Sequence, residues 1–138
     1  ETPWWTGSDK RSLQGAANLA DCAGQRRRVL SEGEGWEDWL DDGHAVHAPV
    51  DSLHANGFGL HSVHGNVWEW CRDRYASYTA PARPQNGLRQ PDDNGPDCVY
   101  RGGSWHGLAR FARCSFRYHD VPERRDSRLG VRPARDLR

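Results

Sequence analysis

The sequence predicts an irregular, loop-rich α+β fold in a single domain. The chain has 138 residues, which suits one domain, and its 28% charged and 36% hydrophobic residues are ordinary for a globular protein. Stretches with the alternating pattern of a strand are few and short, and the segments between them are rich in Gly, Pro, Asn and Asp. Such a pattern favours an irregular α+β domain over a β-sandwich or a barrel.

The first forty residues predict a short helix followed by an ordered loop. Ser8 can cap a helix that runs to about Ala20, because its hydroxyl can accept a hydrogen bond from a free backbone N–H. The acidic, glycine-punctuated stretch 31–43 follows as a loop. We expect Trp36 and Trp39 to hold this loop against the body of the domain, since such large side chains bury much apolar surface.

Strands are expected only after Gly57, where the pattern changes. Residues 67–71 alternate in the manner of a short strand, and the stretch 76–96 reads as a long connection rich in turn-forming residues. Further strands are expected at 98–101, 113–118 and 129–133. The expected sheet is therefore small.

Charge is unevenly distributed along a chain whose formal net charge is zero. From Arg101 onward there are ten Arg against four acidic residues, which indicates a basic face on an acidic body. The alternative is that several of these arginines hold the fold together through buried hydrogen bonds. No basic run alternates with aromatics as in a nucleic-acid-binding module, so no nucleic-acid partner is expected. No membrane partner is expected either, because no apolar run approaches the roughly 20 residues that cross a bilayer.

The cysteines and histidines do not form a recognisable metal or redox motif. The four cysteines are Cys22, Cys71, Cys98 and Cys114. They contain no CxxC, so free buried thiols are expected, and a Cys98 to Cys114 disulfide stays open as an alternative. Two pairs of histidines are His44 with His47 and His61 with His64. A zinc site would need further ligands, and loop histidines are the favoured interpretation.

An ordered series of motifs carries a family resemblance. It begins with ANLAD at 17–21, continues through NGFGL at 56–60 and GNVWEW at 65–70, and ends with RGGSW at 101–105 and LGVRPAR at 129–135. This series resembles the formylglycine-generating enzyme family, the sulfatase-modifying version of the C-type lectin fold. The resemblance implies that residues 1–138 are the carboxy-terminal part of a longer domain of this subtype.

The resemblance also implies structural calcium. The first set of family ligands falls on Asn18, Leu19, Asp42 and His44, and the second on Gly65, Val67 and Glu69. Side-chain and carbonyl oxygens are the ligands that Ca²⁺ prefers. The second set is weaker, because a ligand that is usually Asn or Asp is Ser62 here. The alternatives are that Asp42 is only a turn residue and that Glu69 pairs with an arginine.

The family's oxidative chemistry is not expected. The family enzyme converts a substrate cysteine to formylglycine with copper held by two thiolates, and the corresponding positions here are Gly107 and Ala112. Neither residue can bind a metal, and Cys114 is displaced by two positions. The alternative is a copper-dependent oxidase of the formylglycine-generating type, or a fragment of a related oxidative enzyme.

The segment 106–128 is therefore interpreted as a surface that binds a protein or peptide ligand. It resembles the variable segment of proteins that retroelements diversify on a C-type lectin fold. The candidate ligand-binding residues are His106, Leu108, Arg110, Phe111, Phe116, Tyr118 and His119. For Phe111 and Phe116, burial in the core is the alternative, and Arg113, Arg117 and Arg132 match framework arginines. A missing amino-terminal segment of the domain is a second possible partner.

Overall fold

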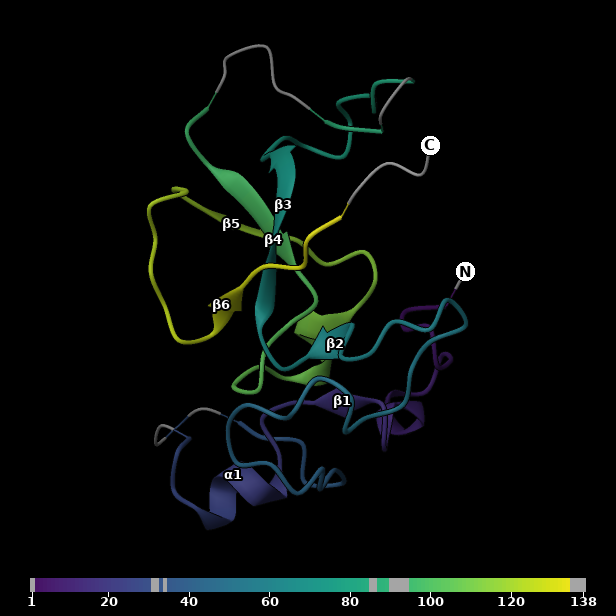
Figure 1. The fold of residues 1–138 in the computed structure, drawn as a ribbon, viewed down its shortest axis with the longest axis vertical. Helices are drawn as coiled ribbons and strands as arrows, with labels where there is room; N and C mark the ends of the chain where they lie inside the picture. The colour runs from purple at the N-terminus through teal and green to yellow at the C-terminus, as the bar shows by residue number, and fades with distance from the viewer. Residues whose placement is uncertain (1, 31–32, 34, 85–86, 90–94, 135–138) are drawn as a thin grey trace.

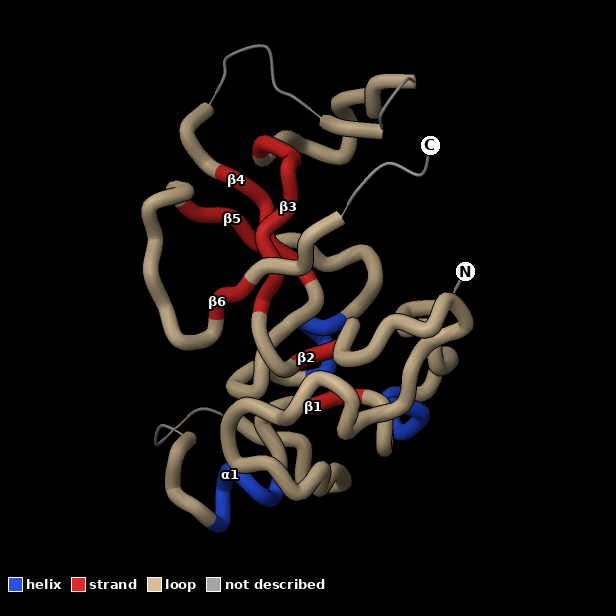
Figure 2. Tube along the Cα trace, viewed as in Figure 1, coloured by secondary structure: helices blue, strands red, loops and turns tan. Residues whose placement is uncertain are grey.

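Nine short elements joined by long loops make up a computed structural model that describes residues 2–30, 33, 35–84, 87–89 and 95–134 (Figure 1 and Figure 2). In chain order they are η1 (Lys10–Leu13), β1 (Ala17–Asn18), α1 (Cys22–Arg26), β2 (His64–Gly65), β3 (Trp68–Arg74), β4 (Cys98–Arg101), η2 (Ala109–Ala112), β5 (Tyr118–Asp120) and β6 (Leu129–Gly130). Here η denotes a 3₁₀ helix. The many loops, short helices and small sheet confirm the irregular, loop-rich class.

Four of the strands form one sheet in the order β5-β4-β3-β6. The β3–β4 and β4–β5 pairs are antiparallel, and β3 and β6 run parallel, with Trp68 opposite Leu129. A separate parallel pair joins β1 to β2. In Figure 1 the four-stranded sheet lies in the upper part of the molecule, α1 and β1 lie in the lower part, and β2 lies between them. The order brings the last strand of the chain beside β3.

The core lies between the amino-terminal segment and η2. Its buried members are Trp4, Leu13, Ala17, Leu19, Leu40, Ala109 and Ala112. Trp39 packs against this cluster, as expected, whereas Trp36 is 41% exposed and does not anchor the acidic loop. Positions 31, 32 and 34 of that loop lie outside the described residues.

Asp21 positions the segments that surround this core. Its buried carboxylate accepts hydrogen bonds from the backbone N–H of Ala23 and Gly24, which caps α1. The second oxygen accepts a hydrogen bond from the backbone N–H of Asp42 at 2.7 Å. A single side chain thereby starts a helix and fixes a distant loop.

The expected helix from Ser8 to Ala20 is wrong in length and in its cap. Only Lys10–Leu13 is helical, and the capping carboxylate belongs to Asp9, which accepts a hydrogen bond from the backbone N–H of Arg11. The chain leaves the helix because Gly15 takes a positive φ of 74° and the next residues pair with β2. Tertiary strand pairing replaces local helix propensity here.

The strand predictions are confirmed near the centre of the sheet and fail at its edge. The strand at 98–101 is present as β4, the strand expected at 67–71 is present as β3, which begins one residue later and extends to Arg74, and 129–133 is a strand only at β6. The strand at 113–118 is wrong: the backbone N–H of Phe116 donates to the carbonyl of Arg113 in a turn, and pairing begins only at β5. In the described part of the chain, no helix has the length and apolar character needed to cross a membrane.

Candidate ligand-binding site

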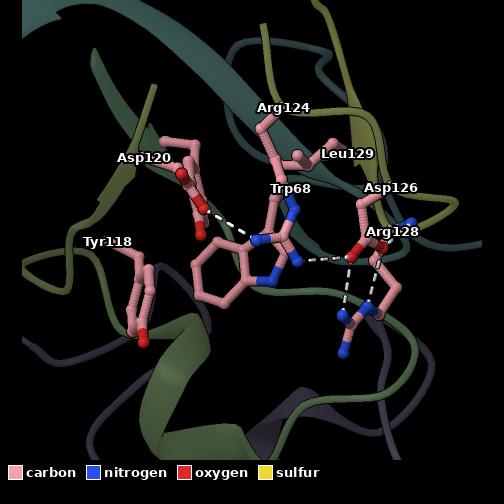
Figure 3. Close-up of a pocket in the computed structure, with 8 residues that line it drawn as sticks. Trp68, Tyr118, Asp120, Arg124, Asp126, Arg128 and Leu129 are labelled. Carbon is pink, nitrogen blue, oxygen red and sulfur yellow. Dashed lines mark hydrogen bonds and ion pairs between the residues drawn. The ribbon is translucent and has the colours of Figure 1, made fainter. Parts of the chain in front are cut away.

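An open cleft of about 270 Å³ lies against one face of the four-stranded sheet (Figure 3). Its lining residues come from every strand of the sheet and from the loop between β5 and β6: Trp68, Tyr100, Tyr118, Asp120, Arg124, Asp126, Arg128 and Leu129. Trp68 packs edge-on against the buried Tyr100 at a centroid distance of 5.3 Å. Burial raises the pKa of Tyr100 to about 12, so its hydroxyl stays protonated.

Ion pairs along the 120–128 loop form the charged rim of this cleft. Arg124 contacts the carboxylates of Asp120 at 3.0 Å and Asp126 at 3.2 Å, and Arg128 contacts Asp126 at 2.6 Å (Figure 3). The hydrogen bond from Arg128 is the main reason that the pKa of Asp126 lies below its usual range. The loop therefore presents alternating charges that are already paired with one another.

Three of the sequence-predicted residues gather beside Trp68. Phe116 and Tyr118 lie 6.1 and 6.3 Å from the Trp68 ring, and Phe111 packs edge-on against Phe116 at 5.2 Å. Tyr118 is 52% exposed, whereas Phe111 and Phe116 are half-buried. Tyr118 alone of the three lines the cleft (Figure 3), and Phe116 stacks on Tyr118 with a centroid distance of 6.4 Å.

The other predicted residues occupy different surroundings. Arg110 lies over the ring of Phe111 at 4.6 Å, and so extends the aromatic cluster. His119 stacks on Tyr75 at 3.7 Å and shares a hydrogen bond of 2.6 Å with Asp97. His106 packs edge-on against Trp105 at 5.1 Å. Leu108 lies close to Gly35 of the acidic loop, away from the sheet.

Sequence reasoning missed most of the residues that line this cleft. Trp68 belongs to the GNVWEW motif, which indicates the family and gives no sign of a place in a cleft. Asp120, Arg124 and Asp126 lie within the 106–128 segment, but nothing in their spacing distinguished them from solvated charges. Leu129 could be found only from the order of the strands, which places β6 beside β3.

Two segments that carry the first calcium ligand set come together in the structure. Asn18 is 0% exposed, and its amide nitrogen donates to the carbonyl oxygens of His44 at 3.4 Å and Val46 at 3.0 Å. The Asp42 carboxylate accepts hydrogen bonds from the backbone N–H of Leu19 and His44. Burial raises the pKa of Asp42 to about 6. The Asn18 side-chain oxygen has no hydrogen-bond partner among the described residues.

In the second predicted set of calcium ligands, the glutamate is paired with an arginine. The Glu69 carboxylate accepts hydrogen bonds from the Arg132 guanidinium at 2.6, 2.9 and 3.0 Å, so this glutamate has a cationic partner of its own. Gly65 and Val67 flank the turn that precedes β3. Their role as calcium ligands stays a prediction.

Of the two positions that hold thiolates in the family enzyme, Gly107 lies just before η2 and Ala112 is the last residue of η2. Ala112 lines a second cleft of about 510 Å³ together with His64, Cys71 and Cys114. All four cysteines are free, as expected, but none is fully buried: Cys22, Cys71 and Cys98 are half-buried and Cys114 is exposed. Burial raises the pKa of the Cys71 thiol. Within the described ranges, no group of three or more His, Cys, Asp or Glu side chains is placed to hold a metal ion.

Three of the paired histidines, His44, His47 and His61, lie in loops as expected, whereas His64 lies in β2. A ring nitrogen of His47 hydrogen-bonds with the carbonyl of Ser127 at 2.7 Å, and one of His61 with the carbonyl of Leu53 at 2.7 Å. His64 is 2% exposed, and burial lowers its pKa to about 4. The contacts of His47 and His61 agree with the loop positions that the sequence predicted for them.

Comparison with known families shows that most of the chain matches one domain family. A model of the sulfatase-modifying factor enzyme 1-like domain matches residues 6–137. The formylglycine-generating enzyme of Bos taurus is 34% identical over 99 residues, which cover 70% of this chain and 26% of that enzyme. The chain thus spans about a quarter of the length of this relative.

Two solved structures are similar to the fold. Treponema denticola variable protein 1 aligns with a TM-score of 0.67 and 24% identity, over 95% of this chain and 40% of that one. PvdO from Pseudomonas aeruginosa aligns with a TM-score of 0.59 and 26% identity, over 74% of this chain and 41% of that one. At 24% identity, the likeness to the variable protein concerns the fold alone.

Proposed function

The chain belongs to the sulfatase-modifying factor enzyme 1-like domain family, and we propose that within this family it is a non-catalytic domain that binds a protein ligand. Family membership implies the C-type lectin-like fold. The 106–128 segment is proposed to be the recognition surface, diversified by a retroelement as in the variable proteins that it resembles.

The position of the cleft on the sheet is the observation that carries this proposal. Most of the side chains that line the cleft belong to the 106–128 segment, while Trp68, Tyr100 and Leu129 supply the floor from the framework. Exposed tyrosine and arginine side chains are typical of recognition surfaces, because they combine large contact area with directional hydrogen bonds. Changes in the segment would alter the cleft and leave the floor in place.

The family's catalytic positions support a role without oxidation. Gly107 has no side chain, and Ala112 is a buried methyl group that packs near Gly103. A copper ion held by two thiolates needs two sulfur ligands at these positions. Cys71 and Cys114 line the same cleft as Ala112, so an oxidase that uses displaced thiols is the competing hypothesis.

Sequence variation among close relatives of the gene tests the proposal. If the segment is diversified, substitutions should concentrate at codons for exposed residues such as Tyr118 and Arg124, and they should spare Trp68 and Tyr100. A nearby reverse transcriptase gene with a near-copy of the 100–135 coding region is also expected. Substitutions spread evenly over 106–128 and the framework would contradict diversification.

A copper assay separates the binding role from the oxidase. The chain should add nothing to the oxygen uptake of a mixture of Cu(I) and a cysteine-containing peptide, in which copper-catalysed thiol oxidation gives a background without protein. The matched variant Cys71→Ala/Cys114→Ala shows whether any signal depends on the displaced thiols. Stoichiometric copper binding with oxygen uptake that this variant abolishes would overturn the proposal in favour of the oxidase.

We also propose a calcium ion between the Asn18 and Asp42 segments. Rotating the Asn18 amide by 180° would direct its oxygen toward the carbonyls of His44 and Val46, and the Asp42 carboxylate holds the same loop. A group of side-chain and carbonyl oxygens with too few hydrogen-bond donors around them is the kind of site that Ca²⁺ prefers. The unsatisfied oxygen of Asn18 favours this ion over a purely structural turn.

Calcium should therefore stabilise the chain. At about a hundredfold excess over the dissociation constant, a site specific for the folded state adds about 3 kcal/mol to the free energy of unfolding. The melting temperature of chelator-treated protein should rise on addition of CaCl₂, and Asp42→Asn should remove most of that gain. Asp38→Asn, at an exposed position nearby, is the matched control. An equal response of both variants would rule out this site.

A further inference from the structure

A third cleft is lined by four arginines. It is separate from the cleft that Trp68, Tyr100 and Tyr118 line, which we call the aromatic cleft. The third cleft measures about 840 Å³, and its walls come from the amino-terminal segment, β3, the connection after β3 and the bend after η2. The residues are Thr2, Pro3, Asp73, Tyr78, Arg89, Arg101, Arg113, Cys114, Ser115 and Arg117. Asp73 is the single carboxylate among them, so positive charge is in clear excess.

Backbone carbonyls hold all four guanidinium groups in place. Arg89 bonds to Ala80, Arg101 to Cys114, Arg113 to Arg110 and Arg117 to Ala76. Carbonyl oxygens orient a guanidinium without neutralising its charge. Among the described residues, none of the four forms an ion pair. The Asp73 carboxylate accepts a hydrogen bond from the backbone N–H of Arg89.

Two of these guanidinium groups also have an unused donor. The Nε atoms of Arg101 and Arg117 are buried and have no hydrogen-bond partner in the part of the chain that the structure describes. Arg117 is fixed by aromatic packing, with its guanidinium 3.7 Å from the Tyr78 ring centroid and 5.5 Å from that of Tyr75. Buried donors without a partner are destabilising, which calls for a ligand that supplies acceptors.

The arginines of the aromatic cleft, in contrast to those of the third cleft, are paired with carboxylates. Arg124 and Arg128 lie within 3.2 Å of aspartate oxygens, and each charge is matched inside the fold. The framework arginine Arg132 is matched in the same way by Glu69. The four arginines of the third cleft are pre-oriented but have no carboxylate partner among the residues that the structure describes, and guanidinium groups free of a carboxylate are well suited to hold phosphate oxygens.

We propose that this cleft is a binding site for a phosphate group, carried on a small molecule or on a peptide side chain. A doubly charged phosphate offsets more of the excess charge than a carboxylate does, and its oxygens can accept from several guanidinium groups at once. The Nε donors of Arg101 and Arg117 would be directed at the bound group. The proposal does not depend on a protein ligand in the aromatic cleft.

Titration with inorganic phosphate tests this site. The probe is added at constant ionic strength in chloride buffer, and the arginine Nε–Hε resonances are followed by NMR. Saturable shifts are expected at Arg101 and Arg117. Loss of one charge-assisted contact in Arg113→Gln should weaken binding about tenfold. The exposed Arg113 keeps risk to the fold low, and Arg125→Gln, at an exposed arginine outside the cleft, should bind like the wild type.

Two further titrations, with acetate and with phenyl phosphate, test whether the cleft prefers a phosphate group. Acetate at the same ionic strength should bind at least several-fold more weakly than phosphate, and phenyl phosphate should bind no more weakly than inorganic phosphate. Shifts that rise linearly without saturation, equal weakening by Arg113→Gln and Arg125→Gln, or acetate binding as tight as phosphate binding would each overturn the proposal.

Discussion

Glu37 joins two segments that are 72 residues apart in the sequence. Its carboxylate accepts hydrogen bonds from Lys10 at 2.9 Å, from the Trp39 indole at 2.5 Å and from the backbone N–H of Ala109 at 2.8 Å. Burial raises the pKa of Glu37, but these donors together outweigh burial and leave that pKa below its ordinary value of 4.5. The residue ties the acidic loop to the start of η2.

Substitution Glu37→Gln should therefore be costly. The amide keeps one acceptor but turns an NH₂ group toward donors, so a loss of about 2–3 kcal/mol in the free energy of unfolding is expected. Urea denaturation followed by tryptophan fluorescence measures it. Glu123→Gln, at an exposed position, should change stability by less than about 0.5 kcal/mol. Equal effects of the two substitutions would contradict the role assigned to Glu37.

His64 should make stability depend on pH. The folded state holds this histidine neutral down to about pH 4, whereas in the unfolded chain it takes up a proton near pH 6.5. The unfolded state therefore binds more protons between these values, and stability falls as pH drops from 6.5 to 4 by up to about 3 kcal/mol.

A variant without the titrating ring checks the His64 prediction. Glutamine can still accept the hydrogen bond that His64 receives from the backbone N–H of Trp5. Free energies of unfolding measured from pH 7 to pH 4 should decline less steeply in His64→Gln than in the wild type. His54→Gln, at an exposed histidine, should keep the wild-type slope. A slope unchanged by His64→Gln would show that other groups dominate.

At the scale of elements, the parallel β1–β2 pair depends on one glycine. Gly65 takes a positive φ of 79°, and a Cβ atom on it would lie 1.8 Å from the carbonyl oxygen of Asn18. That contact is far inside van der Waals distance, and the obstacle is backbone that cannot rotate away. The close approach of the two strands is possible only without a side chain.

Gly65→Ala should consequently separate β1 from β2. A loss of at least about 4 kcal/mol, or failure to fold, is expected, because steric exclusion and backbone strain add together. Gly57→Ala is the control, since a Cβ there would meet nothing within 4 Å. Circular dichroism melts of the two variants give the comparison, and a melt of Gly65→Ala close to that of Gly57→Ala would refute the claim.

The sequence correctly predicted those elements that depend on residue types close together in the chain. The strand at 98–101 contains Val99 and Tyr100, residue types that favour strands, and it follows a turn-rich stretch, so its position is visible in the sequence. The helix after Ser8 and the strand at 113–118 were wrong because partners distant in sequence decide both segments. Ala17 pairs with His64, and Tyr118 pairs with Tyr100. Local propensity contains no information on such partners.

At the scale of the whole molecule, the aromatic cleft is a product of strand order. Its residues converge because β5, β4, β3 and β6 lie side by side, and no spacing in the sequence gives that order. Motifs could identify the framework, including Trp68, and the variable stretch that contains Tyr118. They could not place Asp120, Arg124 and Leu129 around one cleft, since this needs the register between distant strands.

The molecule thus separates a framework that resists change from a surface that tolerates it. The loop after β5 is largely exposed, including Val121, Arg124 and Arg125, whereas Ala109 and Ala112 of η2 are buried in the core. Exposed substitutions away from special features usually alter stability by less than about 0.5 kcal/mol, but enlarging a buried alanine typically costs about 1–3 kcal/mol.

Two libraries should reveal this division. Randomising Tyr118, Val121, Glu123 and Arg125 should leave most members folded, with melting temperatures within a few degrees of the wild type, because these side chains face solvent. Introducing Leu, Ile or Phe at Ala109 and Ala112 should unfold most members, because the core has no room for them. Protease resistance of displayed variants, followed by melts of purified clones, scores both sets. Equal survival of the two libraries would mean that the 118–125 surface is part of the framework, and the proposal of a diversified binding surface would fail with it.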